Sequence, residues 1–211
     1  MTEEGEGLNN RRVGRIEIPE EITVCFGPMF SGKTEGLIDG LVRARIAGLP
    51  PLAFKPAIDN RGEGSTVIKG KAGSEFPAIS IREPKEILKA VGKETRVVGI
   101  DEAQFLSPAI VEVVRQLSQT GKRVVVAGLP ADFRGEPFGP MPDLMAIAHK
   151  LIQFTAVCTF RNGEDEICGS EATQTQRLIG GKPAAYDDPI VLVGGSEAYE
   201  ARCRKHHFVP R

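Results

Sequence analysis

The chain of 211 residues has a hydrophobic fraction of 41% and a charged fraction of 26%, values typical of a globular protein with one sizeable core. Its formal net charge of −1 gives no basic field for a nucleic-acid backbone, and no apolar run approaches the roughly 18 residues of a membrane-spanning helix, so we expect neither nucleic acid nor membrane as a partner. The acidic, polar start does not resemble a secretory signal, so we expect a cytoplasmic protein whose four cysteines stay reduced.

Strand and helix patterns then follow one another along the chain. Residues 1–19 show almost no apolar periodicity and are predicted to form a mobile tail. Short β-branched or apolar runs predict buried strands at Ile22–Phe26, Leu52–Phe54, Arg96–Ile100 and Val124–Ala127. Apolar residues at helical spacing predict helices at Thr34–Ala47, Glu86–Val91, Ser107–Gln119 and Leu144–His149. The stretch Asn60–Gly73 is rich in Gly, Ser and Lys and is predicted to be an exposed, flexible loop.

The order of these elements indicates the fold. Alternating strands and helices from residue 22 to about 157 predict an α/β fold with a mostly parallel sheet that helices cover on both faces. Ser107 is expected to cap a helix that has Pro108 at its first position. After residue 157 the chain changes to short runs with cysteines and histidines. We therefore divide it into a tail (1–19), a main α/β domain (20–157) and a small C-terminal domain (158–211).

A phosphate-binding motif lies between the first predicted strand and the first predicted helix. The segment reads GPMFSGKT and matches G-x-x-x-x-G-K-[ST] in full, in the strand and helix context that the motif requires. The glycines let backbone N–H groups turn toward phosphates, Lys33 supplies a charge between the β- and γ-phosphates, and the Thr34 hydroxyl can ligate Mg²⁺. We therefore predict that the phosphates of Mg·ATP are bound by Gly27, Pro28, Met29, Phe30, Ser31, Gly32, Lys33 and Thr34.

Two carboxylates follow the strand predicted at Arg96–Ile100. Asp101 is positioned to hold Mg²⁺, directly or through water, and Glu102 is a candidate general base. A base that acts on water would make an ATPase, whereas a base that acts on a substrate hydroxyl would make a kinase. The spacing leaves both open, and a solvated carboxylate at a strand end is the simpler alternative for Glu102.

The last part of the chain offers ligands for a structural zinc ion. Three thiolates and an imidazole complete a tetrahedral zinc site with no open position. The four candidate ligands are Cys158, Cys168, Cys203 and His206. The last two have the C-x-x-H spacing, whereas the nine residues between the first two make a wider gap than usual, and His207 is an alternative to His206. Ordinary buried cysteines are the other explanation, and Cys25 is expected to be a small core residue.

Five segments together resemble one enzyme family. They read GPMFSGKT (27–34), GIDEAQF (99–105), DFRGEPFG (132–139), TQTQR (173–177) and VLVGGSEAYEARC (191–203). In this order they closely resemble the type II thymidine kinases, the cytosolic zinc-containing enzymes, and the resemblance runs from about Ile22 to Pro210. Many families share the phosphate loop alone, whereas PMFS within it, followed by DE-x-QF and the C-terminal glycine, tyrosine and cysteine pattern, is far more specific.

The resemblance implies a reaction and roles for further residues. Members transfer the ATP γ-phosphate to the 5′-hydroxyl of thymidine or deoxyuridine, which makes Glu102 the base that takes the hydroxyl proton. Asp59 and Arg61 are implied near the phosphates, Leu129–Gly139 as part of a lid over the acceptor, and Val191–Gly195 as the segment that reads the pyrimidine edge. The implied acceptor-binding residues are Met29, Phe105, Leu129, Phe133, Phe138, Thr175, Val191, Val193, Gly194, Gly195 and Tyr199.

The chain departs from the family pattern in two places, and some roles have alternatives. Many relatives have a C-x-x-C pair where Thr159–Ile167 intervenes here, and some have cysteine in place of His206. Core packing is the alternative role for Phe133 and Phe138. The resemblance also implies an oligomer, usually a tetramer, that the end product dTTP inhibits. The rival interpretations are a zinc-bearing ATPase that acts on nucleic acid and a nucleotide sensor without catalysis.

Overall fold

A six-stranded parallel sheet forms the centre of the molecule. The computed structural model describes residues 21–58, 66–71, 73–191 and 198–211, so the predicted tail lies outside the described residues. The strands of the sheet are β1 (Ile22–Phe26), β2 (Pro51–Pro56), β5 (Ile79–Ile81), β6 (Val97–Ile100), β7 (Arg123–Gly128) and β8 (Lys150–Gln153). Their order is β5-β2-β6-β7-β1-β8, and every neighbouring pair is parallel. The predicted parallel α/β sheet is confirmed.

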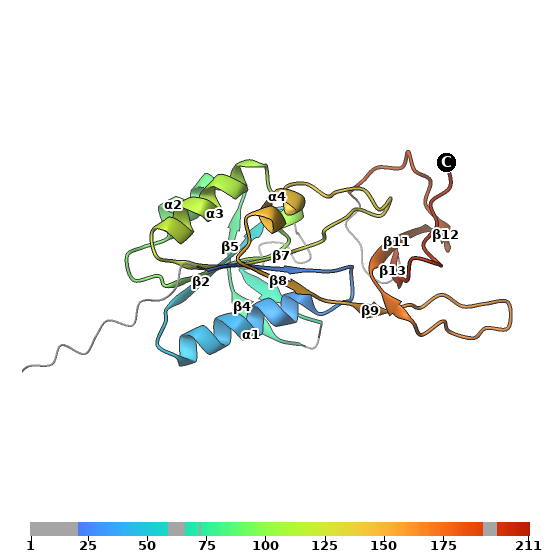
Figure 1. The fold of residues 1–211 in the computed structure, drawn as a ribbon, viewed down its shortest axis with the longest axis horizontal. Helices are drawn as coiled ribbons and strands as arrows, with labels where there is room; N and C mark the ends of the chain where they lie inside the picture. Colours follow the sequence, from blue (N-terminus) through green and yellow to red (C-terminus); the bar gives the residue numbers. More distant parts are fainter. Residues whose placement is uncertain (1–20, 59–65, 72, 192–197) are drawn as a thin grey trace, which may run out of the picture.

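Helices cover both faces of this sheet (Figure 1). The covering elements are α1 (Lys33–Ile46), α2 (Lys85–Ala90), α3 (Ala109–Gln119), α4 (Met141–Ala146) and the hairpin of β3 (Val67–Lys69) and β4 (Glu75–Pro77). On one face, Leu37 and Leu41 of α1 share a buried core with Ala53 of β2. On the other face, Ile110 of α3 shares a core with Phe54 of β2. Neighbouring residues of β2 therefore point to opposite faces of the sheet.

Three local predictions differ from the structure. The segment Asn60–Gly73 was expected to be a loop, but β3 lies within it and pairs with β4, because Ile68 and Phe76 face each other and are buried against α1. The last predicted helix begins and ends earlier, as α4, because the His149 amide donates to the carbonyl of Ile22 and starts β8. The expected Ser107 cap is wrong, since α3 begins at Ala109 without a side-chain capping bond.

A smaller antiparallel region lies beyond the carboxyl ends of the central strands (Figure 1). Its strands are β9 (Ala156–Val157), β10 (Glu171–Ala172), β11 (Gln174–Ile179), β12 (Lys182–Pro183) and β13 (Tyr199–Arg202). β9 pairs with β10, and β11 lies between β12 and β13. Within the described ranges, no helix has the length and apolar character to cross a membrane.

Candidate functional site

The phosphate-binding motif forms a tight loop between β1 and α1. Phe30 and Gly32 have positive φ values of 69° and 85°, so the backbone turns sharply before the helix begins. A Cβ added at Gly27 would lie 2.2 Å from the carbonyl oxygen of Phe154, so only glycine fits at the first motif position. The amide of Met29 donates to Oγ1 of Thr175 on β11 at 3.0 Å. The antiparallel region therefore helps to fix the shape of this loop.

Polar groups inside the loop fit an anionic ligand. Lys33 is buried at the first position of α1, and its Nζ donates to the carbonyl of Pro28 at 3.2 Å. The Ser31 hydroxyl is buried and has no hydrogen-bond partner among the described residues. Unpartnered buried polar atoms are costly, and a phosphate at the start of a helix would satisfy both groups.

The two residues predicted to hold Mg²⁺, Thr34 and Asp101, lie beside the loop. Asp101 follows β6 directly, because its amide donates to the carbonyl of Phe54 at 3.0 Å in continuation of the β2–β6 ladder. The Thr34 hydroxyl donates to Oδ1 of Asp101 at 3.4 Å. Hard oxygen donors of this kind suit Mg²⁺, so the residues predicted to hold Mg²⁺ do lie together.

Glu102 is held in an uncommon backbone conformation. Its φ and ψ are 49° and 41°, a left-handed conformation that non-glycine residues seldom adopt and that often marks a functional site. The side chain is buried and accepts a hydrogen bond of 2.5 Å from Nε2 of Gln104. Oε1 of Gln104 in turn accepts from the amide of Leu129 at 3.0 Å. Gln104 therefore links the candidate base to the start of the lid, a role that the DE-x-QF motif did not reveal.

One cavity brings these groups together. It has a volume of about 130 Å³ and is lined by residues of the loop and by Asp101 and Glu102. Three lysines that the sequence analysis did not single out also line it: Lys55 of β2, Lys69 of β3 and Lys71 after it. The cavity thus combines several cationic groups with the carboxylates of Glu35, Asp101 and Glu102, and such a combination suits a phosphoryl-transfer site.

The predicted lid, residues 129–139, is a preorganised turn. Oδ1 of Asp132 accepts from the amides of Arg134 and Glu136 at 2.8 and 3.1 Å, and its Oδ2 accepts from the Arg134 guanidinium. Gly139 has a φ of 52°, and an added Cβ there would lie 2.2 Å from the carbonyl oxygen of Gln104. The lid is therefore packed directly against the residue that holds Glu102.

Aromatic side chains lie within the lid and beside it. Phe105 and Phe138 make an edge-to-face contact with ring centroids 5.5 Å apart. Phe133 is buried, with the Arg177 guanidinium 5.3 Å from its ring centroid, and Leu129 is buried as well. The burial of Phe133 is compatible with its alternative role in core packing, and its predicted acceptor contact stays a prediction.

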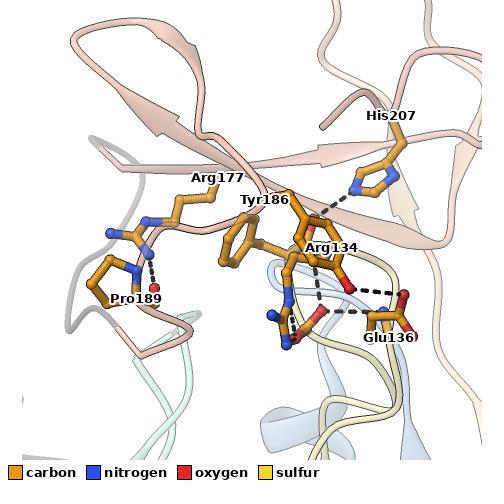
Figure 2. Close-up of polar contacts among 8 residues, drawn as sticks. Arg134, Glu136, Arg177, Tyr186, Pro189 and His207 are labelled. Atoms are coloured by element: carbon orange, nitrogen blue, oxygen red, sulfur yellow. Dashed lines mark hydrogen bonds and ion pairs between the residues drawn. The ribbon is translucent and has the colours of Figure 1, made fainter. Parts of the chain in front are cut away.

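The lid is joined to the C-terminal region by polar contacts (Figure 2). Nε2 of His207 lies 2.8 Å from the carbonyl oxygen of Phe133. The Arg134 guanidinium lies over the Tyr186 ring, 5.0 Å from the ring centroid. The Tyr186 hydroxyl lies 3.5 Å from Oε1 of Glu136. The buried Arg177 donates to the carbonyl of Pro189. The contacts of His207 and Tyr186 join segments far apart in the chain, so sequence patterns gave no signal for Tyr186 or for this role of His207.

The remaining predicted acceptor residues fall into two groups. Thr175 and Tyr199 are buried in neighbouring strands, where Tyr199 lies opposite Arg177 in the β11–β13 register. Val191 is 41% exposed at the edge of the described chain. The other predicted site residues lie outside the described residues, namely Asp59, Arg61, Val193, Gly194 and Gly195.

Three cysteines and a histidine gather in the antiparallel region. Cys158, Cys168, Cys203 and His206 have ligand atoms that all lie within 4.8 Å of one another. Nδ1 of His206 is 3.7 Å from Sγ of Cys158 and 3.5 Å from Sγ of Cys203. A tetrahedral zinc ion with Zn–S near 2.3 Å and Zn–N near 2.0 Å has S···N edges of about 3.6 Å. The donor set and its spacing therefore fit zinc, and His207, which points to the lid, is not part of the set.

The thiols differ in their acidity. Hydrogen bonding with the side chain and backbone of Ser170 lowers the pKa of Cys168 to about 6, so this thiol forms a thiolate easily. Burial raises the pKa of Cys158. Cys25 is buried in the core beside α1, and this burial raises the pKa of its thiol to about 11. Cys25 is therefore an inert core residue, as predicted.

Known proteins resemble this chain over nearly its whole length. The family model described as Thymidine kinase matches residues 20–207. A thymidine kinase from Coprothermobacter proteolyticus is 51% identical over 189 residues, which cover 90% of this chain and 91% of that protein. The family resemblance found in the sequence motifs is thereby confirmed. The chain belongs to the thymidine kinase family.

Proposed function

We propose that this protein transfers the γ-phosphate of ATP to the 5′-hydroxyl of thymidine, which gives dTMP for DNA synthesis by salvage, and that it accepts deoxyuridine in the same way. The observation that carries the proposal is the 51% identity to a thymidine kinase over 90% of the chain. The cavity supports it, because it combines a phosphate-binding loop with Asp101 and Glu102. We expect the enzyme to act in the cytoplasm, where ATP is present and thiols stay reduced.

The chain's own residues account for each part of the transfer. Lys33 and the amides of the loop would hold the β- and γ-phosphates, while Thr34 and Asp101 would hold Mg²⁺, which neutralises phosphate charge when it is bound. Glu102 accepts the proton of the 5′-hydroxyl as that oxygen bonds to the γ-phosphorus and the bond to the ADP oxygen breaks. Because the cavity is small and lined by fixed groups, most of the rate gain comes from positioning and charge neutralisation.

The acceptor is proposed to bind between the lid and the antiparallel region. Phe105, Phe138 and Met29 enclose the pyrimidine, and Val191–Gly195 reads its edge through backbone groups. Thr175 and Tyr199 support that site from β11 and β13. Asp59 and Arg61 are proposed to approach the phosphates.

Zinc is proposed to have a structural role. Its four ligands leave no open coordination position, so it would hold the 158–211 domain together rather than react. The proposed boundary after residue 157 falls at the end of β9, the strand that enters this region.

We also propose an oligomer, usually a tetramer, that dTTP inhibits. Leu151 on the edge strand β8 and Val157 on β9 are 50% and 60% exposed, which supports a covered surface there. The inhibitor would place its base in the acceptor site and its phosphates across the donor site. Sedimentation that shows only monomer would overturn the oligomer, and inhibition that is indifferent to thymidine concentration would overturn the binding mode.

A coupled assay tests the proposed function. ADP release is measured with ATP and a panel of deoxynucleosides, and separately with single-stranded DNA. We expect turnover with thymidine and deoxyuridine but not with deoxyadenosine, because a purine leaves buried polar groups unpaired in a pyrimidine site. ATP consumption that needs DNA and ignores thymidine would favour the rival ATPase instead.

A further inference from the structure

Lys55 is a buried lysine at the carboxyl end of β2. It is only 5% exposed and lines the cavity that also contains Lys33, Asp101 and Glu102. In the β2–β6 register Phe54 lies opposite Ile100, so Lys55 lies beside Asp101. Alternation along the strand places Lys55 on the same face as Ala53, the face covered by α1 and by the phosphate loop that precedes it. The side chain is therefore directed toward the phosphate site.

No polar group of the described chain satisfies the Lys55 ammonium. Among those residues it has no hydrogen-bond or ion-pair partner. Lys122 shows what a structural buried lysine looks like in this molecule, since its Nζ donates to the carbonyls of Gly92, Lys93 and Thr95 at 3.1, 3.2 and 2.6 Å. Lys55 instead lines the cavity, where an anionic ligand can supply the partner of its ammonium group. The contrast indicates that Lys55 is kept for a ligand.

We propose that Lys55 binds a non-bridging oxygen of the γ-phosphoryl group and stabilises that group during transfer. This proposal rests on the proposed kinase function and adds a further cationic residue to it. Lys33 comes from the loop after β1, whereas Lys55 comes from β2, and the sheet order places β6 and β7 between those strands. Two cations that approach from different strands hold the phosphoryl group from two sides, with Glu102 at the end of β6 between them.

Replacement of Lys55 tests this assignment. Lys55→Met should lower kcat by about 10²–10³-fold, the usual loss when one preorganised cationic group is removed from a transition state. Affinity for Mg·ATP, measured by calorimetry without acceptor, should weaken about 10-fold or more. Affinity for ADP should stay unchanged, because ADP lacks the γ-phosphate. Lys55→Arg retains the charge and should retain more activity than Lys55→Met.

Lys122→Met is the matched control, since it removes an equally buried lysine outside the site. It should lower Tm with kcat nearly unchanged, whereas Lys55→Met should lower kcat without lowering Tm. Equal loss of ADP and ATP affinity, a kcat close to that of the unmodified enzyme, or a fall in Tm that accounts for the lost activity would each overturn the assignment. If the unmodified enzyme does not phosphorylate thymidine, the proposed function fails instead, and the ATP-to-ADP affinity ratio still reports on Lys55.

Discussion

At the scale of single residues, the site depends on how one carboxylate is held. Glu102 combines a left-handed backbone with a short hydrogen bond from Gln104. Such a conformation costs of order 1–3 kcal/mol and persists only where the surroundings enforce it. Here the strand β6 before Glu102 and the bond from Gln104 hold this conformation, and Gln104 is itself fixed because its Oε1 accepts from the Leu129 amide. A carboxylate held in this way is suited to accept a proton from one direction.

Glu102→Gln tests the base directly. The amide keeps the size of the side chain but lacks a basic lone pair, so kcat should fall by about 10²–10⁴-fold. Binding of ATP and thymidine should change little, because the shape of the cavity is preserved. Steady-state kinetics with calorimetric binding constants separate the two effects. Thymidine-dependent turnover at nearly the original rate would show that Glu102 is not the base.

Gln104→Glu tests how the base is held. It places a second carboxylate where a donor now lies 2.5 Å from Glu102. Two carboxylates at that distance cannot both ionise easily, so the pKa of the pair rises. The base is then ionised only at higher pH, and the acidic limb of the pH profile of kcat/KM should move upward.

Gln116→Glu is the matched control for this profile. Gln116 makes the same type of bond, from Nε2 to Oε1 of Glu112 at 2.9 Å, but on the exposed surface of α3. The acidic limb of the kcat/KM profile of Gln116→Glu should stay at the pH of the unmodified enzyme. A profile for Gln104→Glu that coincides with the control would mean that Gln104 does not act through Glu102.

At the scale of elements, two sets of contacts hold the lid in place. Asp132 closes the turn from within, and the C-terminal region holds it from outside through His207 and Tyr186 (Figure 2). The same histidine was an alternative zinc ligand in the sequence. Its contact with the Phe133 carbonyl assigns it to the lid and leaves His206 to the metal cluster.

His207→Phe tests the external contact. The ring remains, but the bond to the Phe133 carbonyl is lost, which leaves the lid less well placed over the acceptor. The KM for thymidine should rise about 3- to 10-fold, the effect of one hydrogen bond, while the KM for ATP stays constant. Zinc content measured on the same sample should remain about one per chain. Loss of zinc, or an unchanged KM for thymidine, would contradict the assignment of His207 to the lid.

The elements show which features a sequence can and cannot predict. β1, α1 and the loop between them were predictable, because apolar periodicity and the glycine motif are local signals. The β3–β4 hairpin was missed, since Ile68 is buried only through its partner Phe76 and the packing on α1. Gln104 and Lys55 had no local signal either, because their roles follow from the order of strands in the sheet.

At the scale of the whole molecule, the metal cluster and the phosphate loop share packing. The side chain of Phe30 in the loop packs against the small core that contains Cys158, Cys168 and Cys203. The Met29 amide is bonded to Thr175 of β11 in the same region. Loss of the cluster should therefore disturb the phosphate loop as well as the lid.

Zinc removal tests this coupling. A strong chelator should release about one zinc ion per chain and lower activity, while circular dichroism of the central helices changes little, because both large cores lie elsewhere. Of the four cysteines, the three in the cluster should then react with a thiol reagent. Cys25 should react only in denaturant, because it is 3% exposed and its pKa is raised to about 11.

Thiol counting before and after chelation gives this prediction its control. In the zinc-loaded protein no cysteine should react quickly, since three are metal-bound and the fourth is buried. The time courses give a further check. Thiol exposure, zinc release and loss of activity should change together if the cluster supports the loop through Phe30. Full activity at a zinc content near zero would show that the enzyme does not need the metal. Rapid reaction of all four thiols in folded, zinc-loaded protein would show that the cysteines are neither metal-bound nor buried in the way described.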